Sequence, residues 1–173
     1  ERFGRFLRQG PPKRPTQPAA HESVLAAAPR RIRGRLKKVL QEGRAVEANS
    51  PERVLHGLRI LCKRLRYACE FFSDLYGPPA GKLARRVVAL QDLLGVHQDA
   101  VVAQQAVSRH ALKVPARRAS DRLLVLALGQ LSARHSERAR QARDEFTRAW
   151  KKFDRKKVRT PLLKRMRKSL RGA

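Results

Sequence analysis

The chain has 173 residues, and its 41 lysines and arginines against 14 aspartates and glutamates give a formal charge of +27. A charge this large exceeds what solubility requires and is typical of proteins that bind polyanions. Hydrophobic residues at 42% exclude a fully disordered basic chain, and aromatic residues at 5% argue against a surface that stacks single-stranded nucleic acid bases.

We expect three parts along the chain: a flexible or remnant segment at 1–19, a helical domain at 20–153 and a basic tail at 154–173. The first part contains the proline-rich residues 11–18. It begins without methionine, and residues 1–7 read like the end of a helix whose beginning is missing. A processed product or a trimmed chain explains both features.

The first element predicted after the prolines is an amphipathic helix with Pro29 at or near its start and its end near Asn49. Ser50 and Pro51 then predict a second helix, as its N-cap and its first residue, and Gly77-Pro78-Pro79 predicts where this second helix ends. The apolar stripe of the first helix comprises Ile32, Leu36, Val39, Leu40 and Gly43.

The second helix separates two chemistries onto two faces, because each residue advances by about 100°. One face is apolar and the opposite face carries no acid before Glu70, whereas a solvated helix normally alternates acids with bases. A rigid, acid-free basic face suits a multiply charged anion. The apolar face holds Leu58, Leu61, Cys62, Leu65, Ala68, Cys69 and Phe72, and the basic face holds His56, Arg59, Lys63, Arg66 and Tyr67.

Each of these residues also has an ordinary explanation. The basic side chains fit a solvated charge run, and His56 fits a solvated or capping histidine. Arg64 lies on the flank of the helix and fits either packing or a contact at the rim. The five histidines show no i, i+4 pair and no acid or cysteine at ligand spacing, so we expect no metal site.

A third helix is predicted from about Ala80, with a bend or break at Gly95 before a segment that reaches Ala111 and ends by Pro115. Its inward residues are Leu83, Val87, Leu90 and Leu94. Its polar side repeats the i, i+3, i+4 spacing with Lys82, Arg85 and Arg86, which fits a binding face and a solvated helix start equally well.

The motif His56-x-x-Arg59-x-x-x-Lys63-Arg64-Leu65-Arg66-Tyr67, followed by Glu70-Phe71-Phe72, resembles the second histidine-arginine-lysine motif of the CHAD family, the conserved histidine α-helical domains. Leu90-Gln91-Asp92-Leu93-Leu94-Gly95-x-x-x-Asp99 is similar to the glutamine-leucine-glycine-aspartate motif of that family, and weaker similarity extends over about 30–153. The resemblance implies an all-α fold, an antiparallel bundle of long helices that forms one half of a two-bundle molecule. It also implies that inorganic polyphosphate is bound by basic residues lining the cavity between the bundles.

The family resemblance assigns roles to particular residues. Asp99 is expected to hold a basic side chain through a charge-assisted hydrogen bond, and Gln91 to act in the same way. A full member carries the basic motif twice, whereas this chain carries it once, so we expect a C-terminal half that completes its cavity with a second copy or with the missing N-terminal half. The expected polyphosphate-binding residues are His56, Arg59, Lys63, Arg64, Arg66, Tyr67, Lys82, Arg85 and Arg86.

Residues 120–153 predict one long helix, or two helices broken near Gly129. Acids interrupt the basic stripe of this segment, so ordinary surface is favoured there. The tail at 154–173 predicts either a short docked helix or a frayed basic extension. The candidate core of the long segment comprises Leu124, Leu128, Leu131, Phe146, Trp150 and Phe153.

The sequence offers little for an enzyme to use, since it has no Walker A loop, no paired carboxylates and no nucleophile with an evident base. We therefore expect binding without catalysis and without a cofactor. Nucleic acid and an acidic protein partner are the alternative ligands.

Cys62 and Cys69 lie too far apart on one helix, roughly 10 Å, to form a disulfide. We expect core thiols, no membrane span and a cytoplasmic protein, at polyphosphate granules.

Overall fold

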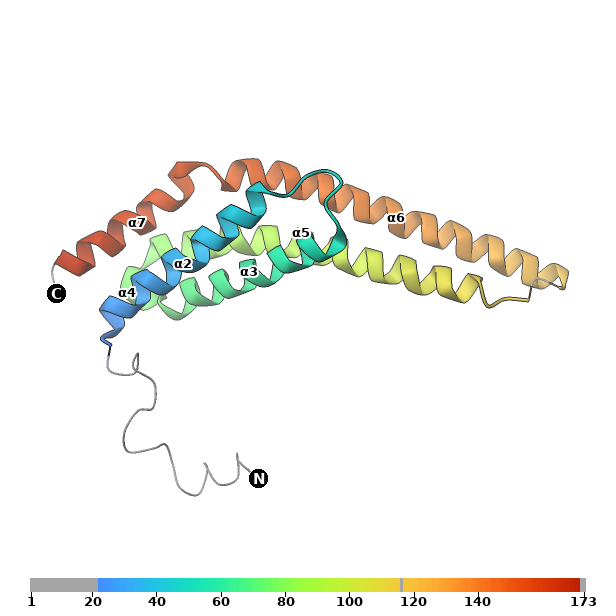
Figure 1. Cartoon of the computed structure of the whole chain (residues 1–173), viewed down its shortest axis with the longest axis horizontal. Helices are drawn as coiled ribbons and strands as arrows, with labels where there is room; N and C mark the ends of the chain where they lie inside the picture. Colours follow the sequence, from blue (N-terminus) through green and yellow to red (C-terminus); the bar gives the residue numbers. More distant parts are fainter. Residues whose placement is uncertain (1–21, 116, 172–173) are drawn as a thin grey trace, which may run out of the picture.

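The computed structural model describes residues 22–115 and 117–171, and these ranges contain six helices packed against one another and no strand (Figure 1). The all-α prediction is confirmed. The segment predicted at 1–19, with its helix end at 1–7, lies outside the described residues.

Helix α2 (Val24–Arg44) begins earlier and ends earlier than the sequence predicts. Ser23 is its N-cap, with the hydroxyl accepting a hydrogen bond from the Ala26 backbone N–H at 3.3 Å, so Pro29 lies inside the helix. The loop that follows is held by Arg143 of a later helix, which donates a hydrogen bond to the Ala48 carbonyl at 2.7 Å. This long-range contact is absent from local sequence patterns, which is why the predicted helix end near Asn49 is wrong.

Helix α3 (Glu52–Phe71) contains the basic motif. The Ser50 hydroxyl does not cap it; it accepts a hydrogen bond from the Glu47 N–H at 2.8 Å within the loop, and Pro51 occupies the cap position. The helix ends before the predicted glycine and prolines, and the short helix α4 (Ser73–Tyr76) follows it. Gly77, at φ +60°, supplies the left-handed turn, and the prolines begin the next helix.

Helices α5 (Pro78–Ala111) and α6 (Ala119–Phe153) are each continuous, so a break at Gly95 and the alternative of a break at Gly129 are wrong. The two helices pack against each other as a long antiparallel hairpin (Figure 1), and α3 packs along α5. Gly95 is buried within α5 instead of interrupting it.

The core lies where α2, α3, α5 and the second half of α6 meet. Gly43 of α2 faces the ring of Trp150, and a β-carbon at Gly43 would lie 2.1 Å from a Trp150 ring carbon. The predicted core residues Phe146, Trp150 and Phe153 are confirmed as buried. Further core residues are Ile32, Leu36, Val39, Leu55, Leu58, Cys62, Leu65, Cys69, Tyr76, Leu83, Val87, Leu90 and Leu94.

The segment predicted as a basic tail contains helix α7 (Lys156–Arg171), which packs on the core. Leu162 and Met166 of this helix are buried. Of the two predicted alternatives, the docked helix is confirmed over the described residues of the segment.

The hairpin of α5 and α6 extends well beyond α2 and α3, and Figure 1 shows its outer part projecting free of the other helices. We call residues 101–138 the arm. Leu124 and Leu131 are 49% and 41% exposed, so the prediction that they belong to the core is wrong, because no third helix within the described residues covers the arm. No described helix is long and apolar enough to cross a membrane.

Candidate functional site

The basic residues of α3 lie on the side of that helix that faces away from the core. We call His56, Arg59, Lys63, Arg66 and Tyr67 the motif face. The side chains of Arg59 and Arg66 are half-buried, whereas the other three are exposed. The apolar residues of α3 that fix this orientation are buried against α2 and α5, so the fold holds the motif face in one position.

Arg59 lies at the seam between α3 and α5. A β-carbon added at Gly95 of α5 would lie 3.5 Å from Arg59 Nε and 3.8 Å from Arg59 Nη2, so the guanidinium rests over this glycine. Arg59 Nε is buried and has no hydrogen-bond acceptor among the described residues. A buried charged donor without a partner is unfavourable for folding alone, and an anion at the seam would compensate for it.

Arg66 lies two turns further along the same seam. Its Nη1 is 3.5 Å from Gln91 Oε1 of α5, and its Nε is 3.2 Å from Glu70 Oε1. The contact with Gln91 agrees with the supporting role that we expected for this residue. Because Glu70 neutralises part of the charge of Arg66, the free positive charge of the motif face is concentrated on Arg59 and Lys63.

Tyr67 lies between two cations. The guanidinium carbon of Arg66 is 4.8 Å from the centre of the Tyr67 ring, and Lys63 Nζ is 5.8 Å from it. Cation–π contacts at exposed sites contribute roughly 0.5–1 kcal/mol and restrict the side chains that make them. The ring therefore helps to hold both cations while its hydroxyl remains available as a donor.

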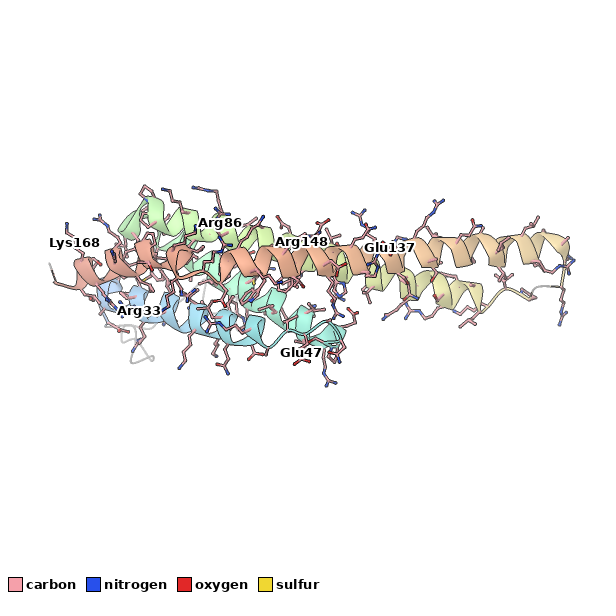
Figure 2. All side chains as sticks on the ribbon, turned by 90° about the horizontal axis from the view of Figure 1, so that it is seen from above. Arg33, Glu47, Arg86, Glu137, Arg148 and Lys168 are labelled. Atoms are coloured by element: carbon pink, nitrogen blue, oxygen red, sulfur yellow. The ribbon has the colours of Figure 1, made fainter. Side chains whose placement is uncertain are left out.

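The structure does not bring the remaining predicted residues to this face. Lys82 and Arg86 are turned by roughly 180° and 140° about the α5 axis from Gln91. Together with Arg85 and Lys157 they line a groove of about 620 Å³ between α5 and α7. Figure 2 shows Arg86 on one side of α6 and α7 and Arg33 on the other.

Arg64 lies on the opposite flank of α3. It lines a groove of about 530 Å³ between α2 and α3 with the arginines and Lys38 of α2.

Asp99 lies one turn beyond Gly95 and is exposed. No hydrogen bond or ion pair joins it to a basic side chain within 22–115 and 117–171, so its holding role stays a prediction.

Sequence reasoning missed two residues that position the motif helix. His97 is buried in α5, with Nδ1 3.1 Å from the Ala139 carbonyl oxygen of α6 and Nε2 3.0 Å from Glu52 Oε2 in the first turn of α3. Arg143 holds the loop before α3 through its carbonyls. His97 follows Leu90 and Leu94 at helical spacing on the inward stripe of α5, and this spacing could have predicted that His97 is buried.

A further groove, of about 680 Å³, lies between α2 and α7 and away from the motif face. Its rim includes Arg44 and Arg159, which both pair with Asp154; Arg44 does so through two hydrogen bonds of 2.8 and 2.7 Å. The hydrogen bond from Arg44 lowers the pKa of Asp154. Part of the positive charge of this groove is therefore already neutralised.

Chemically reactive groups are scarce among the described residues. Cys62 and Cys69 are free and buried, and burial raises the pKa of each thiol to about 12, so neither is a thiolate near neutral pH. Within 22–115 and 117–171, no three histidine, cysteine or acidic side chains gather in a way that could hold a metal ion.

The chain was also compared with known proteins. A family model described as "CHAD domain" matches residues 1–108, which is more than half of the 173 residues. The match contains both motifs and ends near the end of α5, so residues 109–153, for which we expected weaker similarity, lie outside it. No curated protein matches the chain. Its motifs and this match show that the chain belongs to the CHAD domain family.

Proposed function

We propose that this chain binds inorganic polyphosphate at the motif face and does not turn it over. The observation that carries the proposal is the seam between α3 and α5. Among the described residues, Arg59 has a buried nitrogen without an acceptor there, and the exposed charge of Lys63 has no acidic partner. Membership of a family known for binding polyphosphate supports the choice of ligand.

The binding mechanism is charge neutralisation by directed hydrogen bonds. The guanidinium groups of Arg59 and Arg66 take phosphate oxygens in pairs, and Lys63 acts as a mobile point charge. His56 and Tyr67 donate single hydrogen bonds from the exposed edge of the same face. A linear chain of phosphates places one negative charge after another along this row, which a single phosphate does not do.

The groove between α5 and α7 gives a longer polymer a second set of contacts. Lys82, Arg85, Arg86 and Lys157 face it, and none of the described residues that line it is acidic. A polymer long enough to leave the motif face and reach this groove gains contacts within one binding event, so the affinity rises with chain length. Arg64 offers a long polymer a further contact on the other flank of α3.

The proposal extends to the setting of the protein. Buried free cysteines fit the reducing cytoplasm, and polyphosphate granules are where the ligand is concentrated. A second copy of the chain, or an N-terminal half with the first basic motif, would complete a cavity around the polymer.

A competition experiment tests this function against nucleic acid binding. The immobilised chain is offered labelled long-chain polyphosphate, with unlabelled polyphosphate, RNA or duplex DNA at matched phosphate concentration and about 0.15 M salt. We expect polyphosphate to compete best, because clustered cations with few aromatic side chains match an unshielded line of phosphates. Equal or stronger competition by RNA would mean that the chain is a general nucleic acid binder.

A further inference from the structure

The arm carries its large apolar side chains on the outside. Leu112, Leu123 and Leu126 are 87%, 67% and 60% exposed, and Leu124 and Leu131 are also exposed. None of the described side chains between 101 and 138 is buried. A pair of long helices without one buried side chain has no core of its own, and exposed apolar surface on this scale marks an interaction site.

The seam between the two helices of the arm contains a polar cluster. Ser108 Oγ lies 3.0 Å from Ser132 Oγ, and Gln104 donates a hydrogen bond to Ser132 Oγ at 3.4 Å. These polar groups share the seam with half-buried apolar residues such as Val107, Val125 and Leu128, whereas the five leucines named above face outward into solvent. Leu124, Ala127 and Leu131 are all exposed and follow the i, i+3, i+7 spacing of an apolar packing stripe.

The same part of the arm is free of charge. Residues 100–108 and 123–133 contain no Lys, Arg, Asp or Glu, in a chain whose formal charge is +27. Charged residues resume at the tip of the arm, from Arg109 to Arg122, and again towards the core from Arg134 onward. An acidic partner would find nothing to pair with on this neutral stripe, and it would be drawn to the basic faces elsewhere.

We propose that two copies of this chain pair through their arms and form a four-helix bundle. A second copy offers the same neutral leucine stripe, so a two-fold interface is self-complementary in shape and chemistry. Contact at the arms also keeps the strongly basic parts of the two molecules apart, which limits the repulsion between two chains of +27.

Charge also selects the orientation of the pair. The tip is basic, with Arg117, Arg118 and Arg122 near Asp121, whereas Glu137 and Asp144 lie towards the core end of α6. Antiparallel arms bring the basic tip of one copy beside residues 134–145 of the other, where four arginines and three acids nearly balance and Arg140 pairs with Glu137 and Asp144. Parallel arms would bring two basic tips together, so the pair is antiparallel.

The test is the molar mass of the full chain without polyphosphate, by light scattering and sedimentation at about 50 μM chain and 0.3 M salt. We expect the mass of two chains for the unchanged protein and of one chain for Leu124→Gln/Leu131→Gln. The control Leu112→Gln/Leu126→Gln removes two leucines of equal or greater exposure off the stripe, and it should remain a dimer. A monomeric unchanged protein, or a dimer that survives the stripe variant, would overturn the proposal.

Oxidative cross-linking tests the orientation. Ala127→Cys lies in the middle of the exposed stripe and should form a disulfide with its copy, whereas Lys113→Cys at the tip should not. Cross-linking of Lys113→Cys alone would contradict the antiparallel arrangement. The native Cys62 and Cys69 are buried in the core and do not take part. Neither experiment contains polyphosphate, so their failure would leave the proposed ligand untouched.

Discussion

The pairing of Arg59 with Gly95 joins the two family motifs in one physical contact. Arg59 comes from the basic motif and Gly95 from the downstream motif, 36 positions later, and the guanidinium rests where a side chain at Gly95 would be. This glycine therefore leaves space for an arginine and does not break the helix.

This contact allows the motif face to be disturbed without changing any charge. Gly95→Leu places a branched side chain where the Arg59 guanidinium lies. It should displace Arg59 from the seam and lower the affinity for polyphosphate severalfold. Gly95→Ala leaves ordinary contact distances to Arg59; it should keep the affinity and stabilise the helix by up to about 1 kcal/mol. Titration with labelled polyphosphate and thermal melting measure the two effects.

The control for this prediction is Gly129→Leu, because a β-carbon at Gly129 meets nothing within 4 Å. This variant should leave affinity unchanged. Equal affinity of Gly95→Leu and the control, both folded, would show that Arg59 at the seam does not contribute to binding.

At the scale of the helices, a few close contacts decide how α2 packs against α6. Gly43 lets the Trp150 ring approach the α2 backbone, since a β-carbon there would lie 2.1 Å from a ring carbon. Two further contacts, from Arg143 to the loop after α2 and from Arg44 to Asp154, tie the same elements together. The orientation of α3 follows from this packing.

Gly43→Ala should therefore destabilise the fold although alanine is the better helix former. The indole ring must move, and overpacking of this kind typically costs about 1–3 kcal/mol in the free energy of unfolding. Gly34→Ala on the exposed side of the same helix meets no atom within 4 Å and should stabilise by up to about 1 kcal/mol. Urea unfolding of both variants measures the difference, and a Gly43→Ala variant as stable as Gly34→Ala would refute this account of the packing.

The sequence predicted the elements better than their boundaries. Apolar periodicity identified α2, α3, α5 and α6 and most of the core, because burial of one helix face leaves a regular pattern. The boundaries near Ser50 and Gly95 were predicted wrongly because distant side chains, Arg143 and Arg59, decide what those residues do. Leu124 and Leu131 were assigned to the core because periodicity reports an apolar face and not what covers it.

The candidate site was predictable to the same extent. One helix face could be read from the spacing of Arg59, Lys63 and Arg66, and Gln91 from the second motif. The angles of Lys82 and Arg86 from Gln91 on one continuous helix could also be read, but the packing of α7 on that side of α5 could not. Local spacing carries no information about which neighbour a polar helix side meets.

At the scale of the whole molecule, separate basic surfaces predict a dependence on polymer length. Lys82→Ala/Arg86→Ala removes two charges from the groove between α5 and α7. This variant should bind short polyphosphate normally and long polyphosphate several times more weakly, because only a long chain spans both surfaces. Binding of a length series to the variant and to the unchanged protein would reveal this, and an equal loss at every length would argue against the second surface.

The central claim is that a defined face, and not the total charge of +27, binds polyphosphate. Arg59→Ala/Lys63→Ala and Lys164→Ala/Lys168→Ala each remove two charges and leave 27 − 2 = +25. Lys164 and Lys168 are exposed on α7 and line none of the grooves described above. The two variants therefore lose the same net charge at different places on the molecule.

Equilibrium binding of long-chain polyphosphate to these two variants, after their folding is verified by circular dichroism and melting, tests the claim most directly. Charge-assisted hydrogen bonds contribute about 1.5–3 kcal/mol each, and 1.4 kcal/mol is about tenfold in affinity. We predict a loss well above tenfold for Arg59→Ala/Lys63→Ala and a much smaller loss for Lys164→Ala/Lys168→Ala. Equal losses in the two folded variants would contradict the claim and favour a diffuse basic surface.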